Sequence, residues 1–189
     1  MMKRDEMLKA FARQRKDEIV VAVYTAAQEI THIQPNDLNY TFVGAMGQGS
    51  SHALGLALGR PDKKVIVFDG DGSLLMNLGS LVTIGAVAPR NLVHFVCQNG
   101  NYEANGSHPL PNPKVDFTGL ARSAGYAKCH EFSELASFEQ QIGHVLGEDG
   151  PVFATLHIER TRPLTYDYPA LYAAEKRRAL KAELKRTTR

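Results

Sequence analysis

The sequence predicts an α/β protein with a doubly wound, mostly parallel sheet of about six strands flanked by helices. β-rich apolar runs alternate with segments of helical apolar spacing along the chain, an order typical of parallel sheets. Polar, glycine-rich stretches follow several of these runs, where the binding edge of such a sheet is expected. The 189 residues suffice for one α/β domain with a full core.

The first third of the chain predicts two helices and two strands before a small-residue helix. Apolar side chains recur at helical spacing over residues 2–16. The β-rich run at 19–24 predicts a strand, and Thr25 is expected to cap the helix that follows it. A short strand is expected at 40–43. Small residues at 53–59 predict a helix that can pack closely on a sheet.

The middle of the chain predicts two buried strands joined by a helix. Apolar runs at 65–69 and 92–97 predict the strands, and the segment 76–88 predicts a helix that ends at Pro89. The loop at 99–114 is rich in Gly, Pro and Asn. A loop of this length beside a binding edge is more often functional than not.

The last strands and helices of the domain continue the same alternation. We expect a helix at 117–124, a strand at 126–130, a helix at 133–146 and a final strand at 152–158. These segments complete the count of about six strands and place helices between successive strands.

The chain is expected to comprise one domain, residues 1–159, and a basic helical extension, residues 160–189. Seven Lys or Arg and two Glu give residues 171–189 a net charge of +5, which leaves −3 for the rest. The pattern of this tail is helical, with Ala and Leu spacing and one aromatic residue at its start. We therefore expect a solvated or partner-facing helix and no nucleic-acid binding.

The composition, 43% hydrophobic and 22% charged, is that of a soluble globular protein. No stretch reaches the roughly 18–20 apolar residues of a membrane span, and the first residues lack the apolar core of a signal peptide. Cys97 and Cys129 lack CxxC spacing, so reduced, buried structural thiols are expected. These features predict a cytoplasmic protein that does not associate with membranes.

Two polar clusters at the ends of expected neighbouring strands carry the clearest functional signal. Gly70-Asp71-Gly72-Ser73 follows one strand and Asn99-Gly100-Asn101-Tyr102 follows the next, with 27 residues between Asp71 and Asn99. Mg2+ prefers oxygen ligands and often bridges to phosphate oxygens, and glycines let backbone N–H groups approach a diphosphate. The interpretation is one site for a metal and a diphosphate. The alternative is two unrelated turns with polar tips.

This constellation resembles the diphosphate-binding motif of thiamine diphosphate enzymes, in which Gly-Asp-Gly is followed at a similar distance by Asn. The resemblance implies a thiamine diphosphate-binding fold with thiamine diphosphate and Mg2+ as cofactors. Asp71 and Asn99 would bind Mg2+ through their side chains, and Asn101 through its backbone carbonyl. Other cofactor-binding positions that the resemblance implies are Thr25, Gly70, Gly72, Ser73 and Tyr102.

The turn Gly44-Ala45-Met46-Gly47 is the second part of the resemblance. In that family a bulky apolar residue at the position of Met46 wedges between the two cofactor rings and imposes a bent conformer. The same match implies that the Gly44 carbonyl and the Met46 N–H would bond the aminopyrimidine ring. Taken alone, the residues also fit a glycine-rich turn with a core methionine.

Three stretches, residues 44–59, 65–79 and 91–109, are similar to the sulfopyruvate and phosphonopyruvate decarboxylase group of this family. The resemblance implies decarboxylation of a small anionic 2-oxo acid. Gln98 and residues 106–110 depart from the pattern of that group, which leaves the particular substrate open. His52 and His108 are the candidate catalytic residues, because either could face a substrate anion or relay a proton.

The chain is too short for a second α/β domain of usual size. Thiamine diphosphate enzymes use an activating Glu on a separate pyrimidine-binding domain, so the resemblance implies an α subunit that carries it, in an α2β2 or larger assembly. Glu29, Glu103 and Glu131 are not expected to replace that residue, because they belong to the diphosphate-binding half.

Other functions of the same fold stay open at this point. One is an acetolactate synthase-like carboligase, which product analysis would separate from a decarboxylase. Another is the β subunit of a 2-oxoacid:ferredoxin oxidoreductase, against which two lone cysteines argue, since that class commonly needs cysteine-bound iron–sulfur clusters. A third is a non-catalytic regulatory or assembly subunit, which would have no need of both Asp71 and Asn99.

Overall fold

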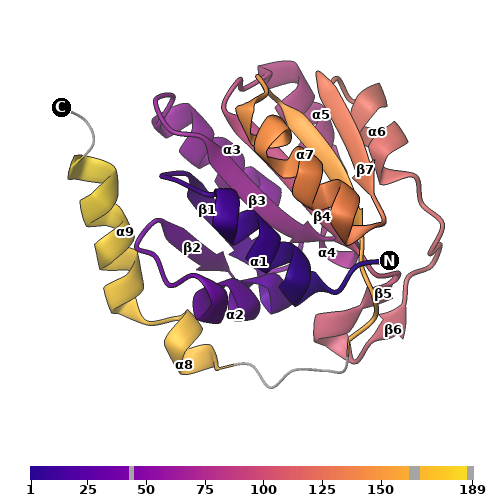
Figure 1. The fold of residues 1–189 in the computed structure, drawn as a ribbon, viewed down its shortest axis with the longest axis horizontal. Helices are drawn as coiled ribbons and strands as arrows, with labels where there is room; N and C mark the ends of the chain where they lie inside the picture. Colours follow the sequence, from indigo (N-terminus) through magenta and orange to yellow (C-terminus); the bar gives the residue numbers. More distant parts are fainter. Residues whose placement is uncertain (43–44, 162–166, 187–189) are drawn as a thin grey trace.

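The computed structural model describes residues 1–42, 45–161 and 167–186, and its centre is a six-stranded sheet (Figure 1). The strand order is β2-β1-β3-β4-β8-β7, and every neighbouring pair is parallel. The strands are β1 (Ile19–Val23), β2 (Asn39–Phe42), β3 (Val65–Gly70), β4 (Leu92–Gln98), β7 (Lys128–Phe132) and β8 (Val152–His157). The predicted six-stranded parallel sheet is confirmed.

Helices cover both faces of the sheet, each over its own apolar core. One face is covered by α1 (Arg4–Gln14), α2 (Tyr24–Ile33) and α7 (Leu135–Gly147). The other is covered by α3 (Gly49–Gly59), α4 (Asp71–Leu75), α5 (Gly79–Val87) and α6 (Phe117–Ser123). On the first face, Phe68 stacks on Phe95 with ring centroids 5.2 Å apart, and Phe11 meets Phe68 edge-on. The doubly wound arrangement follows from this division.

The predicted loop at 99–114 contains secondary structure of its own. Strands β5 (Asn101–Tyr102) and β6 (His108–Pro109) pair antiparallel, and a short helical turn, η1 (Glu103–Asn105), lies between them. The Leu110 N–H donates to the Gly100 carbonyl (3.0 Å). This small hairpin holds the asparagine cluster in a defined conformation at the end of β4.

The C-terminal helices α8 (Tyr168–Leu171) and α9 (Ala174–Arg186) run along the open edge of the sheet beside β2 (Figure 1). Leu171 and Leu180 are buried, and the Thr41 hydroxyl donates to the Leu171 carbonyl (3.3 Å). Covering an edge strand in this way blocks pairing with other chains. Within the described ranges, none of the helices has both the length and the apolar character needed to cross a bilayer. A domain boundary after residue 159 stays a prediction.

Several element boundaries differ from the sequence prediction. Helix α2 begins at Tyr24, so Thr25 lies inside its first turn and the predicted capping role is wrong. The helix predicted at 76–88 is present as α5 but begins three residues later, at Gly79. Residues 76–78 form turns that separate it from α4, a short helix that was not predicted. Strand β7 begins at Lys128, because Tyr126 is buried beside His94 instead of entering the sheet. Of the predicted segments, residues 43, 162–166 and 187–189 lie outside the described residues.

Helix α5 packs against the end of α6 through Gly85, and this contact predicts a large loss of stability on substitution. A Cβ at Gly85 would lie 1.8 Å from the Ala124 carbonyl oxygen, a backbone atom that cannot rotate away. We expect Gly85→Ala to lower the free energy of unfolding by at least about 1–3 kcal/mol, the usual cost of overpacking.

Gly55, in the exposed part of α3, provides the matched control for this substitution. A Cβ at Gly55 has no neighbour within 4 Å, so Gly55→Ala should raise stability by about 0.5–1 kcal/mol through helix propensity. Chemical denaturation followed by circular dichroism checks both variants. Equal stabilities for the two would contradict the packing argument.

Candidate active site

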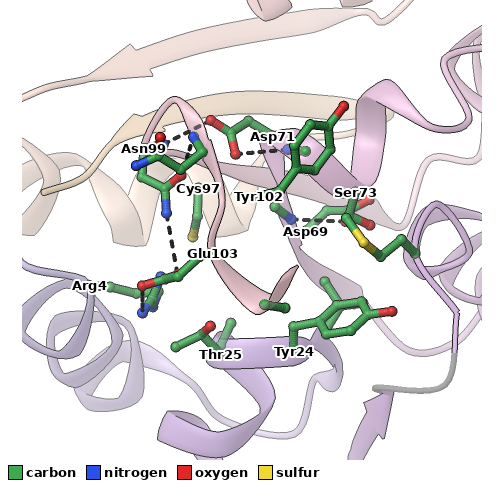
Figure 2. A pocket seen from close by; sticks show the side chains of 17 residues that line it. Arg4, Tyr24, Thr25, Asp69, Asp71, Ser73, Cys97, Asn99, Tyr102 and Glu103 are labelled. Atoms are coloured by element: carbon green, nitrogen blue, oxygen red, sulfur yellow. Dashed lines mark hydrogen bonds and ion pairs between the residues drawn. The ribbon is translucent and has the colours of Figure 1, made fainter. Parts of the chain in front are cut away.

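A pocket opens at the carboxyl ends of β1, β3 and β4 (Figure 2). Strand β2 lies on one side of β1 and strand β3 on the other, so the chain reverses its direction of winding there. Ligands of doubly wound folds bind at such a switch point. The predicted site residues that line this pocket are Thr25, Met46, Gly70, Asp71, Gly72, Ser73, Asn99, Asn101 and Tyr102.

Asp71 is a buried carboxylate that the backbone of both binding turns holds in place. It is only 2% exposed. Its Oδ2 accepts hydrogen bonds from the N–H groups of Asn99 (2.9 Å) and Gly100 (2.7 Å), and its Oδ1 accepts one from Gly72 (2.8 Å). Burial raises the pKa of Asp71 to about 6, because it disfavours the charged form more than these N–H groups favour it. These bonds join the two predicted clusters through one side chain.

Asn99 and Asn101 are held in a turn directly opposite Asp71. The Asn99 Oδ1 accepts from the Asn101 N–H (2.9 Å), and the Asn99 Nδ2 donates to Glu103 Oε2 (3.3 Å). With its amide oriented to match its neighbours, the Asn101 side chain accepts from Arg160 Nε (2.9 Å) and donates to the Gly100 carbonyl (3.0 Å). These hydrogen bonds tie the loop to its own backbone and to the side chains of Glu103 and Arg160.

The oxygen atoms of the pocket suit a hard cation. Asp71 Oδ1 accepts one hydrogen bond and keeps acceptor capacity. Asp69 Oδ2 is buried and has no hydrogen-bond partner among the described residues. The charged side chains among the described lining residues are Arg4, Asp69, Asp71 and Glu103, which sum to −2 when ionised. A diphosphate would be repelled by this charge unless a divalent cation came with it.

A metal at this site would depend on more than carboxylates. Within the described part of the chain, no cluster of three or more His, Cys, Asp or Glu could hold a metal ion. Amide and main-chain oxygens, together with oxygens of a bound phosphate group, would have to complete the coordination. The donor set of Asp71, Asn99 and Asn101 therefore fits a magnesium ion bound jointly with a diphosphate.

Gly72 leaves room for the ring of Tyr102 at the wall of the pocket. A Cβ at Gly72 would lie 2.6 Å from Tyr102 Cδ1. The ring thus packs directly on the backbone of the Gly-Asp-Gly turn, which any larger residue would prevent. Tyr102 therefore supports the turn by packing, whether or not it also contacts a ligand.

The Met46 turn is fastened to the segment that follows Asp71. The Gly47 N–H donates to Ser73 Oγ (3.0 Å), and Asn77 Nδ2 donates to the Gly47 carbonyl (2.8 Å). Gly47 has φ +80°, a conformation that favours glycine. Met46 itself is partly buried and lines the pocket. Gly44, the other predicted contact in this turn, lies outside the described residues.

The two candidate catalytic histidines do not line this pocket. His52 lies in α3, stacks on Tyr40 with ring centroids 5.6 Å apart, and bonds the Gln48 carbonyl through Nδ1 (2.9 Å). His108 is exposed in β6. Their catalytic roles therefore stay predictions, and a role for either would need the substrate to extend beyond the pocket described.

Sequence reasoning did not assign five polar or reactive residues of the pocket wall to the site: Arg4, Tyr24, Asp69, Cys97 and Glu103. Tyr24 has φ +48°, a strained value for a non-glycine residue that often marks a functional site. Burial raises the pKa of Cys97 to about 12, so this thiol is inert as predicted. Cys129 is only partly buried, unlike the prediction. The adjacency of Asp69 to the Gly-Asp-Gly motif was the one available signal.

A doubly wound parallel sheet, with an aspartate turn and an asparagine turn joined at its binding edge, defines a diphosphate-binding domain of the thiamine diphosphate enzyme class. Residues 19–156 match the family "Thiamine pyrophosphate enzyme, C-terminal TPP binding domain". The chain belongs to this family, which confirms the resemblance stated from the sequence.

Similar proteins include relatives named phosphonopyruvate decarboxylase and sulfopyruvate decarboxylase subunit beta. The chain is 34% identical to sulfopyruvate decarboxylase subunit beta of Methanothermobacter thermautotrophicus, over 90% of this chain and 88% of that protein. It is 37% identical to phosphonopyruvate decarboxylase of Streptomyces viridochromogenes, over 76% of this chain. It spans only 36% of that protein's length.

Solved structures support the fold. Benzoylformate decarboxylase from Polynucleobacter necessarius superposes with a TM-score of 0.71 over 86% of this chain and 34% of its own, at 21% sequence identity. At this sequence identity, the structural similarity shows the fold alone. It confirms the predicted thiamine diphosphate-binding fold.

Proposed function

We propose that the chain is the diphosphate- and Mg2+-binding subunit of a two-subunit, thiamine diphosphate-dependent decarboxylase of a small anionic 2-oxo acid. The observation that carries this proposal is the meeting of Asp71, Asn99 and Met46 at one pocket. The β subunit of sulfopyruvate decarboxylase, similar over nearly its whole length, supports the two-subunit form.

Different residues of the pocket would bind the metal, the diphosphate and the rings of the cofactor. Asp71 and Asn99 would hold Mg2+ through side-chain oxygens, and Asn101 through its carbonyl. Gly70, Gly72 and Ser73 form the turn that would face the diphosphate, while Met46, held through Gly47, would support the bent cofactor. When bound, the cofactor supplies the ring that accepts electrons as the 2-oxo acid loses CO2. The protein contributes position and charge.

The names of the relatives support the proposed substrate class. Sulfopyruvate and phosphonopyruvate are 2-oxo acids with a second, strongly anionic group, and relatives named for each match this chain at 34–37% identity. We therefore place a sulfonate- or phosphonate-bearing 2-oxo acid first among candidate substrates. Residues 106–110, which depart from the family pattern, do not select between the two.

A partner subunit is proposed because the described pocket lacks a glutamate that could activate the cofactor. Its one described glutamate, Glu103, is tied to Arg4. The partner would be a pyrimidine-binding α subunit that carries the activating Glu, in an α2β2 or larger assembly.

Calorimetric titration of thiamine diphosphate, with and without Mg2+, tests the proposal. The titration is made into this chain alone and into its complex with the candidate α subunit. We expect tight binding only with Mg2+ and only in the complex, because the pocket is acidic and half complete. Absence of binding in every combination would refute the cofactor assignment.

A further inference from the structure

We propose that Glu103 is a positioning residue for the metal site: it orients the amide of Asn99 so that the amide oxygen faces the cation. The inference rests on the proposed function. It assigns a role to a residue that is not among the proposed metal ligands Asp71, Asn99 and Asn101. Figure 2 shows Glu103 between Arg4 and Asn99, with a dashed contact to Asn99.

The carboxylate of Glu103 contacts both Asn99, in the loop after β4, and the buried guanidinium of Arg4. Its Oε2 accepts from Arg4 Nη1 (2.7 Å) and from Asn99 Nδ2 (3.3 Å). Its Oε1 accepts from Arg4 Nη2 (3.3 Å) and from the Thr161 hydroxyl. Glu103 is therefore fixed on both oxygens, so it can hold Asn99 from a rigid position.

An asparagine can bind a cation only if its amide is turned the right way. The side chain carries an oxygen that accepts and an NH2 that donates, at nearly equal distances from Cγ. Glu103 draws the NH2 of Asn99 to one side, and the Asn101 N–H draws the oxygen to the other (2.9 Å). Without the carboxylate, the amide could flip and present its NH2 to the cation, which would oppose binding.

Arg4 anchors this arrangement to the rest of the fold. Its guanidinium is 3% exposed, and it also pairs with Glu29 through Nε (2.8 Å) and Nη2 (3.2 Å). A buried charge must be paired, and Arg4 has one carboxylate on each side. Glu29 pairs Arg4 with α2, whereas the Arg4–Glu103 pair joins α1 to the loop after β4 and holds that loop from outside the pocket.

Positioning can be separated from simple electrostatic attraction by comparing two variants. Glu103→Gln removes the charge but keeps an oxygen where Oε2 accepts from Arg4 Nη1 and Asn99. Its new NH2 replaces Oε1, so the 3.3 Å bond from Arg4 Nη2 is lost while the NH2 can donate to the Thr161 hydroxyl. Glu103→Ala removes both the charge and the contact. If Glu103 positions Asn99, Mg2+ affinity should fall at least about tenfold in the Ala variant and stay within about threefold in the Gln variant.

Glu29→Ala is the matched control. This variant removes the other carboxylate that is paired with Arg4, but it leaves Glu103 in contact with Asn99. We expect its melting temperature to fall as in Glu103→Ala, while its Mg2+ affinity stays within about threefold of wild type. A double-mutant cycle completes the design: in an Asn99→Ala background, Glu103→Ala should cause almost no further loss of affinity.

Mg2+ titration by calorimetry, at saturating thiamine diphosphate and in the complex with the α subunit, measures all these variants. Equal losses in the Gln and Ala variants, or additive losses in the double variant, would overturn the positioning role and leave the proposed function intact. A wild-type complex that binds no Mg2+ would overturn both.

Discussion

The Asp71→Ala variant is expected to lose Mg2+-dependent binding of thiamine diphosphate, with a Kd at least roughly 100-fold higher than that of wild type. Loss of even an outer-shell partner of a metal ligand costs about 10- to 100-fold, and Asp71 is proposed as a direct ligand. The same carboxylate accepts hydrogen bonds from three backbone N–H groups of the two binding turns. Its removal therefore damages the metal site and the geometry of the diphosphate turn together.

The fold must be checked in the same variant, because those N–H groups would lose their acceptor. Each buried group left unsatisfied costs about 1–3 kcal/mol, so Asp71→Ala should also melt at a lower temperature. Asp71→Asn separates the two effects, since its remaining oxygen can still accept from Asn99 and Gly100. Asp71→Asn should therefore retain most of the stability and still bind Mg2+ poorly. Asp37→Ala, an exposed change in the turn between α2 and β2, should alter neither property.

Calorimetry of thiamine diphosphate and Mg2+ measures the affinities, and thermal unfolding by circular dichroism measures the stabilities. Wild-type affinity in a folded Asp71→Ala variant would show that the metal lies elsewhere. Loss of affinity in Asp71→Ala with full affinity in Asp71→Asn would instead indicate that Asp71 acts only by holding the turns.

Sequence reasoning located the pocket because its main residues are local to strand ends. Asp71 and Asn99 each follow an apolar run, and parallel strands bring such positions to one edge of the sheet. Nothing comparable links Arg4 to Glu103, which lies 99 residues away along the chain. Charged residues in a helix pattern are normally solvated, so only the packing of α1 and α2 against the loop reveals that Arg4 is buried.

Contacts between residues far apart in the sequence also explain the errors in the predicted element boundaries. The hydrophobic pattern over 76–88 correctly predicts a helix but not its start: the Asn77 side chain bonds the Gly47 carbonyl, and turns at 76–78 form a break between α4 and α5. The break brings the Met46 turn and the Asp71 turn together. Long-range hydrogen bonds of this kind leave no periodic signal in the sequence, although they set the geometry of the site.

Decarboxylation is expected only when the chain is combined with its proposed α subunit. The chain alone, with Mg2+ and thiamine diphosphate, should release no measurable CO2 from sulfopyruvate or phosphonopyruvate. The complex should exceed it by at least about 100-fold, the lower range of what one general acid–base group contributes. An α subunit whose activating Glu is changed to Gln should assemble and bind the cofactor, yet fail to turn over.

If the chain alone released CO2, the activating group would have to lie in this chain and not in the α subunit. Turnover by the chain alone would require one of its own carboxylates to activate the cofactor, and Glu103 is the one glutamate among the described residues of the pocket wall. Its two hydrogen bonds from Arg4 hold the carboxylate toward α1, which is the physical reason to expect inactivity. Glu103→Gln, assayed in the chain alone, would then distinguish an internal activating residue from contamination by a partner.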